Sequence, residues 1–166
     1  MTIVQQAAAV VAPWASFYGN SRVAETLVTF GHFGGMMTAG GFALSADRAT
    51  LKAEGATGDQ RLRQLHDLRS VHPIVVGALV VTTISGLLMF AADLENLAVM
   101  PAFWVKLALV VVLLANGALM LNVEKGLERV AGQNARAWRQ LRYASVASLL
   151  LWFAVVLVGS FLPNAG

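Results

Sequence analysis

Long apolar runs separated by short polar clusters are the dominant pattern along this chain. The hydrocarbon core of a bilayer requires roughly 20 apolar residues per helix. Four stretches reach that length, at about residues 23–46, 73–92, 102–123 and 143–162. The pattern therefore predicts an all-α fold, in which residues 1–166 form a single transmembrane domain built as an integral membrane four-helix bundle.

Capping residues and prolines support these boundaries. Ser21 is suited to be the N-cap of the first span, with Glu25 in its first turn. Pro73 lies near the first position of the second span, and Pro101 directly precedes the third, as is common where helices begin. Pro163 is expected to end the fourth span.

The distribution of charge orients the four spans. Charged residues make up 13% of the chain, against ~25% in a typical soluble domain. Ten of the 12 Lys and Arg residues lie in the two connections 48–69 and 125–142, whereas the connection 93–100 carries none. By the positive-inside rule the two basic connections face the cytoplasm. The expected topology is N-out and C-out in a bacterial inner (plasma) membrane, with both termini on the periplasmic side.

Two further segments are predicted to lie on the membrane surface. Residues before the first span carry Trp14, Phe17 and Tyr18, which are typical interfacial anchors, so a short N-terminal interfacial helix is expected; a partly disordered terminus is the alternative. In the first basic connection, a stretch from 59 to 71 has leucines three residues apart. It is interpreted as a short helix on the anionic leaflet.

His32 is the most informative polar residue at membrane depth. It lies nine residues after the start of the first span, or ~14 Å below its outer end at the rise of an α-helix. Gly31 and Gly35 flank it with the GxxxG spacing, which allows another helix or a flat cofactor to approach the backbone closely. These two glycines are therefore predicted helix-packing positions.

Two methionines are predicted to lie at the level of His32. Met36 shares its helix face, and Met89 reaches a similar depth in the antiparallel second span. Imidazole and thioether ligands suit a haem iron or Cu(I), so His32, Met36 and Met89 are candidate haem b or copper ligands, with His32 the candidate metal ligand. Two other roles stay open for His32: a hydrogen bond to a neighbouring helix, and a proton relay. His72 lies ~20 Å away in depth, too far to share one haem with His32.

The remaining intramembrane and interfacial polar residues have simpler expected roles. Asn116 is predicted to form an interhelical hydrogen bond. Lys106 is expected to extend toward the outer surface, near Asp93 or Glu95. A metal site made of His66, Asp67 and His72 is the alternative to solvated interfacial positions for these three residues.

Several function classes are excluded by the sequence. The net charge of +3 is explained by the basic connections, and no basic stripe with interleaved aromatics is present, so no nucleic acid is an expected partner. The absence of cysteine excludes thiolate metal sites and cysteine nucleophiles. No serine-hydrolase, phosphate-loop or zinc-protease motif occurs, so the chain is predicted to be non-catalytic.

The stretch from His72 to Asn122 carries short motifs that resemble a known group of membrane proteins. It resembles a family of small four-helix bacterial membrane proteins with no settled activity, and more distantly the membrane domain of the copper-resistance D proteins and the cytochrome b561-like bundles. The distant resemblance implies copper or haem handling, and His32 is the position here that matches a ligand. The motifs that carry it are Ser85-Gly86-Leu87-Leu88-Met89-Phe90, Phe103-Trp104-Val105-Lys106 and Gly31-His32-Phe33-Gly34-Gly35.

Three functions follow from these observations. The first is an accessory or scaffold subunit, in contact with the lipid bilayer and with other membrane subunits or further copies of itself, because short loops leave little surface for independent chemistry. The second is a haem b- or copper-binding module for electron transfer or copper handling that uses His32. The third is a small transporter, which usually requires broken helices and a polar midplane site.

Overall fold

The computed structural model describes residues 2–53, 58–130 and 133–162, and the expectation of an all-α fold is confirmed over these ranges, which contain no strand. Pro163, expected to end the last span, lies outside them. The helices are α1 (Ile3–Asn20), α2 (Arg22–Ala53), α3 (Gly58–Ala92), α4 (Leu94–Val99), α5 (Pro101–Arg129) and α6 (Ala135–Phe161).

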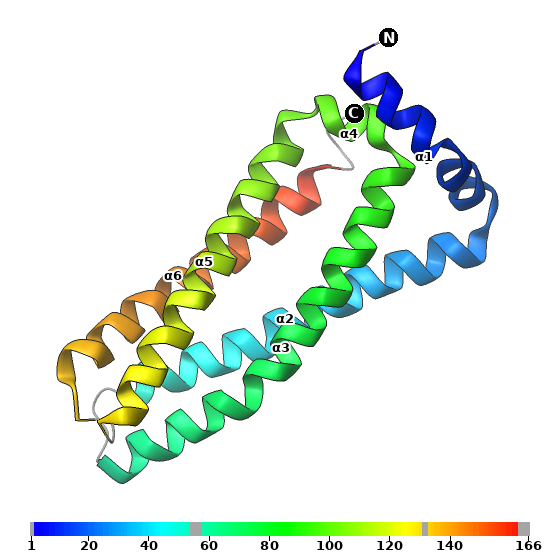
Figure 1. Cartoon of the computed structure of the whole chain (residues 1–166). Coiled ribbons are helices and arrows are strands. Elements are labelled where there is room, and N and C mark those ends of the chain that lie inside the picture. The colour runs from blue at the N-terminus through cyan, green and yellow to red at the C-terminus, as the bar shows by residue number, and fades with distance from the viewer. Residues whose placement is uncertain (1, 54–57, 131–132, 163–166) are drawn as a thin grey trace.

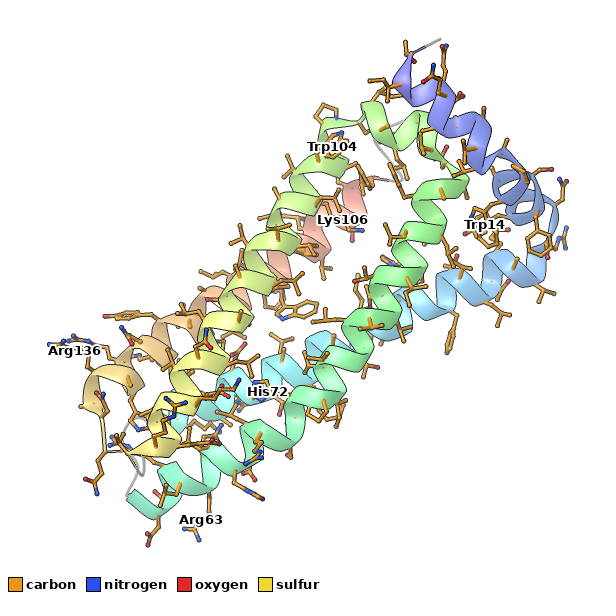
Figure 2. All side chains as sticks on the ribbon, viewed as in Figure 1. Trp14, Arg63, His72, Trp104, Lys106 and Arg136 are labelled. Carbon is orange, nitrogen blue, oxygen red and sulfur yellow. The ribbon has the colours of Figure 1, made fainter. Side chains whose placement is uncertain are left out.

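The four long helices form two antiparallel pairs (Figure 1). α2 packs along α3, and α5 packs along α6. The pairs meet mainly through α2 and α6, whereas α3 and α5 make few contacts. We call the end that carries α1 and α4 the terminal end, and the end where the chain turns from α2 to α3 and from α5 to α6 the hairpin end. Arg63 and Arg136 lie at the hairpin end, and Trp104 and Lys106 lie toward the terminal end (Figure 2).

Three of these helices are long and apolar enough to cross a membrane: α3, α5 and α6. They indicate a membrane protein whose apolar helices are suited to contact a lipid bilayer. α2 has 32 residues but is not among the three. Its glycines and His32 lower its mean hydropathy.

The N-terminal segment is helical. In α1 the side chain of Thr2 accepts a hydrogen bond from the backbone of Gln5, whose side chain accepts one from the backbone of Thr2, so a capping box begins the helix. Pro13 is accommodated inside α1. The indole Nε1 of Trp14 donates to the carbonyl oxygen of Leu88 at 2.8 Å, so this side chain packs onto α3. The location of α1 at a membrane surface stays a prediction.

The second predicted span begins earlier than expected. The stretch from 59 to 71 and the span after it form one helix, α3, of 35 residues, with Pro73 in its interior. The expectation of a separate surface helix, and of Pro73 as a helix start, is therefore wrong. The reason is that Leu65 and Leu68 are buried against protein, at 3% and 2% exposure, instead of lying on lipid.

A small apolar core at the hairpin end explains this extension. Leu65 and Leu68 of α3 join Leu127 of α5 and Trp138 of α6 in one buried cluster. The guanidinium of Arg61 lies 5.6 Å from the centre of the Trp138 ring, a distance suited to a cation–π contact. All four long helices thus contribute to a packed layer beyond the ends of the predicted spans.

The α2–α3 contact is closest at Gly35. A Cβ atom at this position would overlap Oγ1 of Thr82 and lie 2.9 Å from the carbonyl oxygen of Ala78. Gly31 also faces α3, but a Cβ there would make only ordinary contacts, at 3.8 Å from Val81 and Ser85. Close approach of the two backbones therefore depends on Gly35.

The second helix pair is joined by a polar contact. The side-chain amide of Asn116 in α5 donates to the carbonyl oxygen of Ala144 in α6 at 2.9 Å. In a membrane such interhelical bonds contribute roughly 0.6–2 kcal/mol each. The bond fixes the register of α5 against α6 near the middle of the pair.

Replacing Gly35 with alanine tests the close contact. Gly35→Ala is expected to lower the free energy of unfolding by about 1–3 kcal/mol, because a backbone carbonyl must move to admit the methyl group. Gly34→Ala is the matched control, since a Cβ there meets nothing within 4 Å. Thermal unfolding in detergent, followed by circular dichroism, measures both variants. Equal melting temperatures for the two would contradict the assigned contact.

Candidate functional site

A cavity of about 910 Å³ lies at the terminal end of the bundle. It brings together residues from all six helices, and α1 and α4 contribute to its rim with Tyr18 and Leu97. His32, Met36 and Met89, which sequence spacing places at one level, all line this cavity, together with Lys106. The three candidate ligands therefore share one site, although they come from two helices.

His32 is held in a defined orientation by α3. Its Nδ1 lies 3.0 Å from the carbonyl oxygen of Thr82 and 3.4 Å from Oγ of Ser85. A carbonyl oxygen only accepts, so Nδ1 carries the proton and donates to it. In the neutral ring Nε2 is then unprotonated and retains its lone pair. Histidines that bind metals are commonly oriented by such a bond from the other ring nitrogen.

The His32 ring lies directly over a glycine of α3. A Cβ atom at Gly86 would be 3.1 Å from Cε1 of His32 and 3.3 Å from Nδ1. A side chain at this position would push the ring away from its hydrogen-bond acceptor. The absence of a side chain at Gly86 therefore allows the imidazole to pack against α3.

Aromatic residues and α1 close the cavity toward the end of the bundle. The rings of Phe90 and Phe103 stack at 4.7 Å with an interplanar angle of 5°, which joins the ends of α3 and α5. Trp14 anchors α1 to α3 through the carbonyl of Leu88. The side chains at this end of the cavity are largely apolar, as expected for a site that binds a largely apolar ligand.

Lys106 differs from its expected arrangement. Its Cε and Nζ would each lie 3.5 Å from a Cβ placed on Gly159, so its side chain runs along α6. Within the described ranges it forms no ion pair with Asp93 or Glu95. Lys106 thus supplies a cationic group to the wall of a cavity whose lining also includes Asp93, and the two residues form no ion pair.

The hairpin-end histidines do not form the alternative metal site. His66 and Asp67 are exposed, while Nε2 of His72 lies 3.4 Å from Oε2 of Glu124. Among the residues that the structure describes, no three His, Asp or Glu side chains are grouped to hold a metal ion. A metal in the terminal-end cavity would therefore require sulfur ligands from methionine.

Sequence reasoning missed a pair of buried carboxyls at the hairpin end. Asp47 and Glu124 are 2% and 6% exposed, and neither was predicted to be a site residue. Each lies one residue beyond a predicted span on the same side, and His72 directly precedes a third span. The occurrence of three titratable residues at the same side of the predicted spans was the sequence feature that could have identified these carboxyls.

Comparison of the chain with protein-family models, with curated proteins and with solved structures found no match. The site is therefore interpreted from its own geometry.

Replacing Trp14 with phenylalanine tests how α1 closes the cavity. Trp14→Phe removes the bond to Leu88, and loss of one such bond costs about 1 kcal/mol. We expect backbone amides of α1 to exchange with deuterium about fivefold faster. Trp104→Phe is the control, because its Nε1 bonds locally to the carbonyl of Ala98. If the two variants exchange alike throughout α1, the anchoring role is wrong.

Proposed function

We propose that the chain is a membrane protein that binds one haem b in the terminal-end cavity, with His32 as an axial ligand. The observation that carries this proposal is the orientation of His32: Thr82 holds Nδ1, and Nε2 remains available beside two methionine side chains in the same cavity. His and Met are axial ligands of haem in electron-transfer proteins. A bound haem would supply one-electron transfer.

The cavity fits this group in size and chemistry. Its volume of about 910 Å³ lies within the 300–1,000 Å³ of typical cofactor and ligand sites, whereas a single ion needs far less space. Gly86 leaves room for the His32 ring, and Met36 and Met89 offer the second ligand. Lys106 supplies a positive charge suited to a haem propionate.

A copper(I) ion is the second candidate. It is favoured by the donor set, because one imidazole and two thioethers are soft ligands that select Cu(I). The same residues would hold it: His32, Met36 and Met89. Metal analysis separates the two candidates, since haem requires iron in a one-to-one ratio with the chain.

The proposed topology has four spans. We include α2 as the fourth because it packs along membrane-competent α3 and its 32 residues exceed the length a bilayer needs. With ten of 12 Lys and Arg residues at or beside the hairpin end, the positive-inside rule supports cytoplasmic hairpins and periplasmic termini.

A role as a subunit of a larger membrane assembly stays a prediction. Small residues suited to helix packing are partly used within the chain: Gly35 packs on α3, and Ser145 and Ser148 of α6 are buried. A partner would have to bind elsewhere. A chain that binds haem can also be a subunit of such an assembly, so the haem proposal and the subunit role are compatible.

An optical spectrum with metal analysis tests the haem proposal. Protein extracted gently from its own membrane is expected to show a Soret band and about one iron per chain. His32→Ala should lose at least about 90% of the bound haem, because the axial bond is removed. His66→Ala is the control, since that histidine is exposed at the hairpin end. Colourless, iron-free protein from haem-sufficient cells would overturn the proposal.

Cysteine labelling tests the topology, and the natural chain provides a background without cysteine. A membrane-impermeant maleimide applied to intact cells should label Gln6→Cys in α1 and not Glu128→Cys at the end of α5. Both side chains are exposed, so both should react fully after the membrane is dissolved. Labelling of Glu128→Cys in intact cells would reverse the orientation.

A further inference from the structure

A second cavity, of about 240 Å³, lies toward the hairpin end between α2, α3, α5 and α6. It shares no lining residue with the terminal-end cavity. His72 marks its place on α3 (Figure 2). It is therefore a separate site, and the haem proposal makes no use of it.

Two buried carboxyls line this second cavity. Asp47 comes from α2 and Glu124 from α5, and they are 2% and 6% exposed. Oδ2 of Asp47 and Oε1 of Glu124 are buried without a hydrogen-bond partner. An ionised carboxylate without a partner costs several kcal/mol to bury. Burial therefore favours the neutral acids, and a positively charged group between them would stabilise the ionised forms. Two unpartnered carboxyl oxygens at one cavity are the partners that such a group requires.

The protein itself supplies only part of that positive charge. Nε2 of His72 lies 3.4 Å from Oε2 of Glu124, and the hydroxyl of Ser148 hydrogen-bonds to Asp47. The lining of the cavity contains no Lys or Arg. One imidazole therefore faces two carboxyls, and the charges of Glu128 and Asp47 both oppose ionisation of Glu124.

The rest of the lining is apolar and includes an aromatic ring. Leu68, Val75 and Leu113 form walls of the cavity, and Trp152 contributes its indole. A bare metal ion is disfavoured, because no group of three His, Asp or Glu side chains able to hold one occurs among the described residues. Apolar walls, an indole face and acceptor-only oxygens are the surroundings that suit an alkylammonium group.

We propose that this cavity binds a small organic ammonium cation, whose charged nitrogen lies between the carboxyls of Asp47 and Glu124 and whose apolar substituents contact Trp152 and the aliphatic walls. The volume of about 240 Å³ is below the 300–1,000 Å³ of sites for drug-sized ligands, so the ligand is small. The few contacts between α3 and α5 leave this side as the entry route.

The test uses benzyltrimethylammonium as the probe and neopentylbenzene, its uncharged carbon analogue, as the comparison. Binding to the full chain in detergent is measured by isothermal titration calorimetry, with protein-free micelles titrated in parallel. The variants are Asp47→Asn and Glu124→Gln, which keep side-chain volume and remove charge. Glu95→Gln is the matched control, because it makes the same substitution at an exposed position of α4 that does not line this cavity.

We expect saturable binding of the cation to the natural chain, weakened at least about tenfold in Asp47→Asn and in Glu124→Gln and by less than about twofold in Glu95→Gln. Circular dichroism confirms that each variant is folded; if either charge variant fails to fold, the comparison of the two probes on the natural chain decides. The proposal is overturned by equal binding of the neutral probe, by no saturable binding of the cation, or by unchanged affinity in both charge variants. Binding of Na⁺ or K⁺ without the organic cation would also overturn it.

Discussion

The arrangement of this protein depends on the contact between Trp152 of α6 and the backbone of α2 at Gly40. Atoms of the indole lie 3.5 to 3.8 Å from where a Cβ of Gly40 would be, which is van der Waals distance, so the ring packs directly over this glycine. Ala39 and Leu113 complete this buried cluster in the middle of the bundle. Because the two helix pairs meet along α2 and α6, α3 and α5 remain apart, and the cavities lie where those helices do not pack.

The two cavities differ in their polar groups. At the terminal end, Lys106, Asp93 and the oriented imidazole of His32 line a large cavity, in which the ammonium group suits an anionic ligand group and the imidazole suits a metal centre. Toward the hairpin end, Asp47 and Glu124 face a small apolar cavity, which suits a cation. Buried polar groups without protein partners are rare because of their cost. Asp47 and Glu124 each carry such a group, which supports ligand binding in the cavity toward the hairpin end.

Hydrophobic length predicted the three apolar helices and the short connection between α3 and α5 correctly, because a bilayer imposes a length that composition alone reveals. It predicted the course of α3 around Pro73 wrongly. The stripe of Leu65 and Leu68 has the same spacing whether lipid or protein covers it, and the covering Trp138 is about 70 residues away in the chain. Only the tertiary arrangement distinguishes these two environments.

The candidate site was likewise predictable only in part. Counting residues along antiparallel helices placed His32 and Met89 at one level, because helical rise is regular. A hydrogen bond from His32 to a neighbouring helix was one of the predicted roles, but its acceptor, Thr82, was not predictable, since it depends on the rotation of α2 against α3. The carboxyls Asp47 and Glu124 were missed because a charge just beyond a span is normally solvated, and their position at the same boundary as His72 does not by itself show that neighbouring helices bury them.

The most direct test of the account is the identity of the axial ligands of the bound haem. Near-infrared magnetic circular dichroism of the oxidised protein distinguishes histidine–methionine from bis-histidine ligation by the position of its charge-transfer band. The account predicts a histidine–methionine band, because His32 shares its cavity with Met36 and Met89 and His72 lines a different one. A bis-histidine band, or protein with no haem to measure, would contradict it.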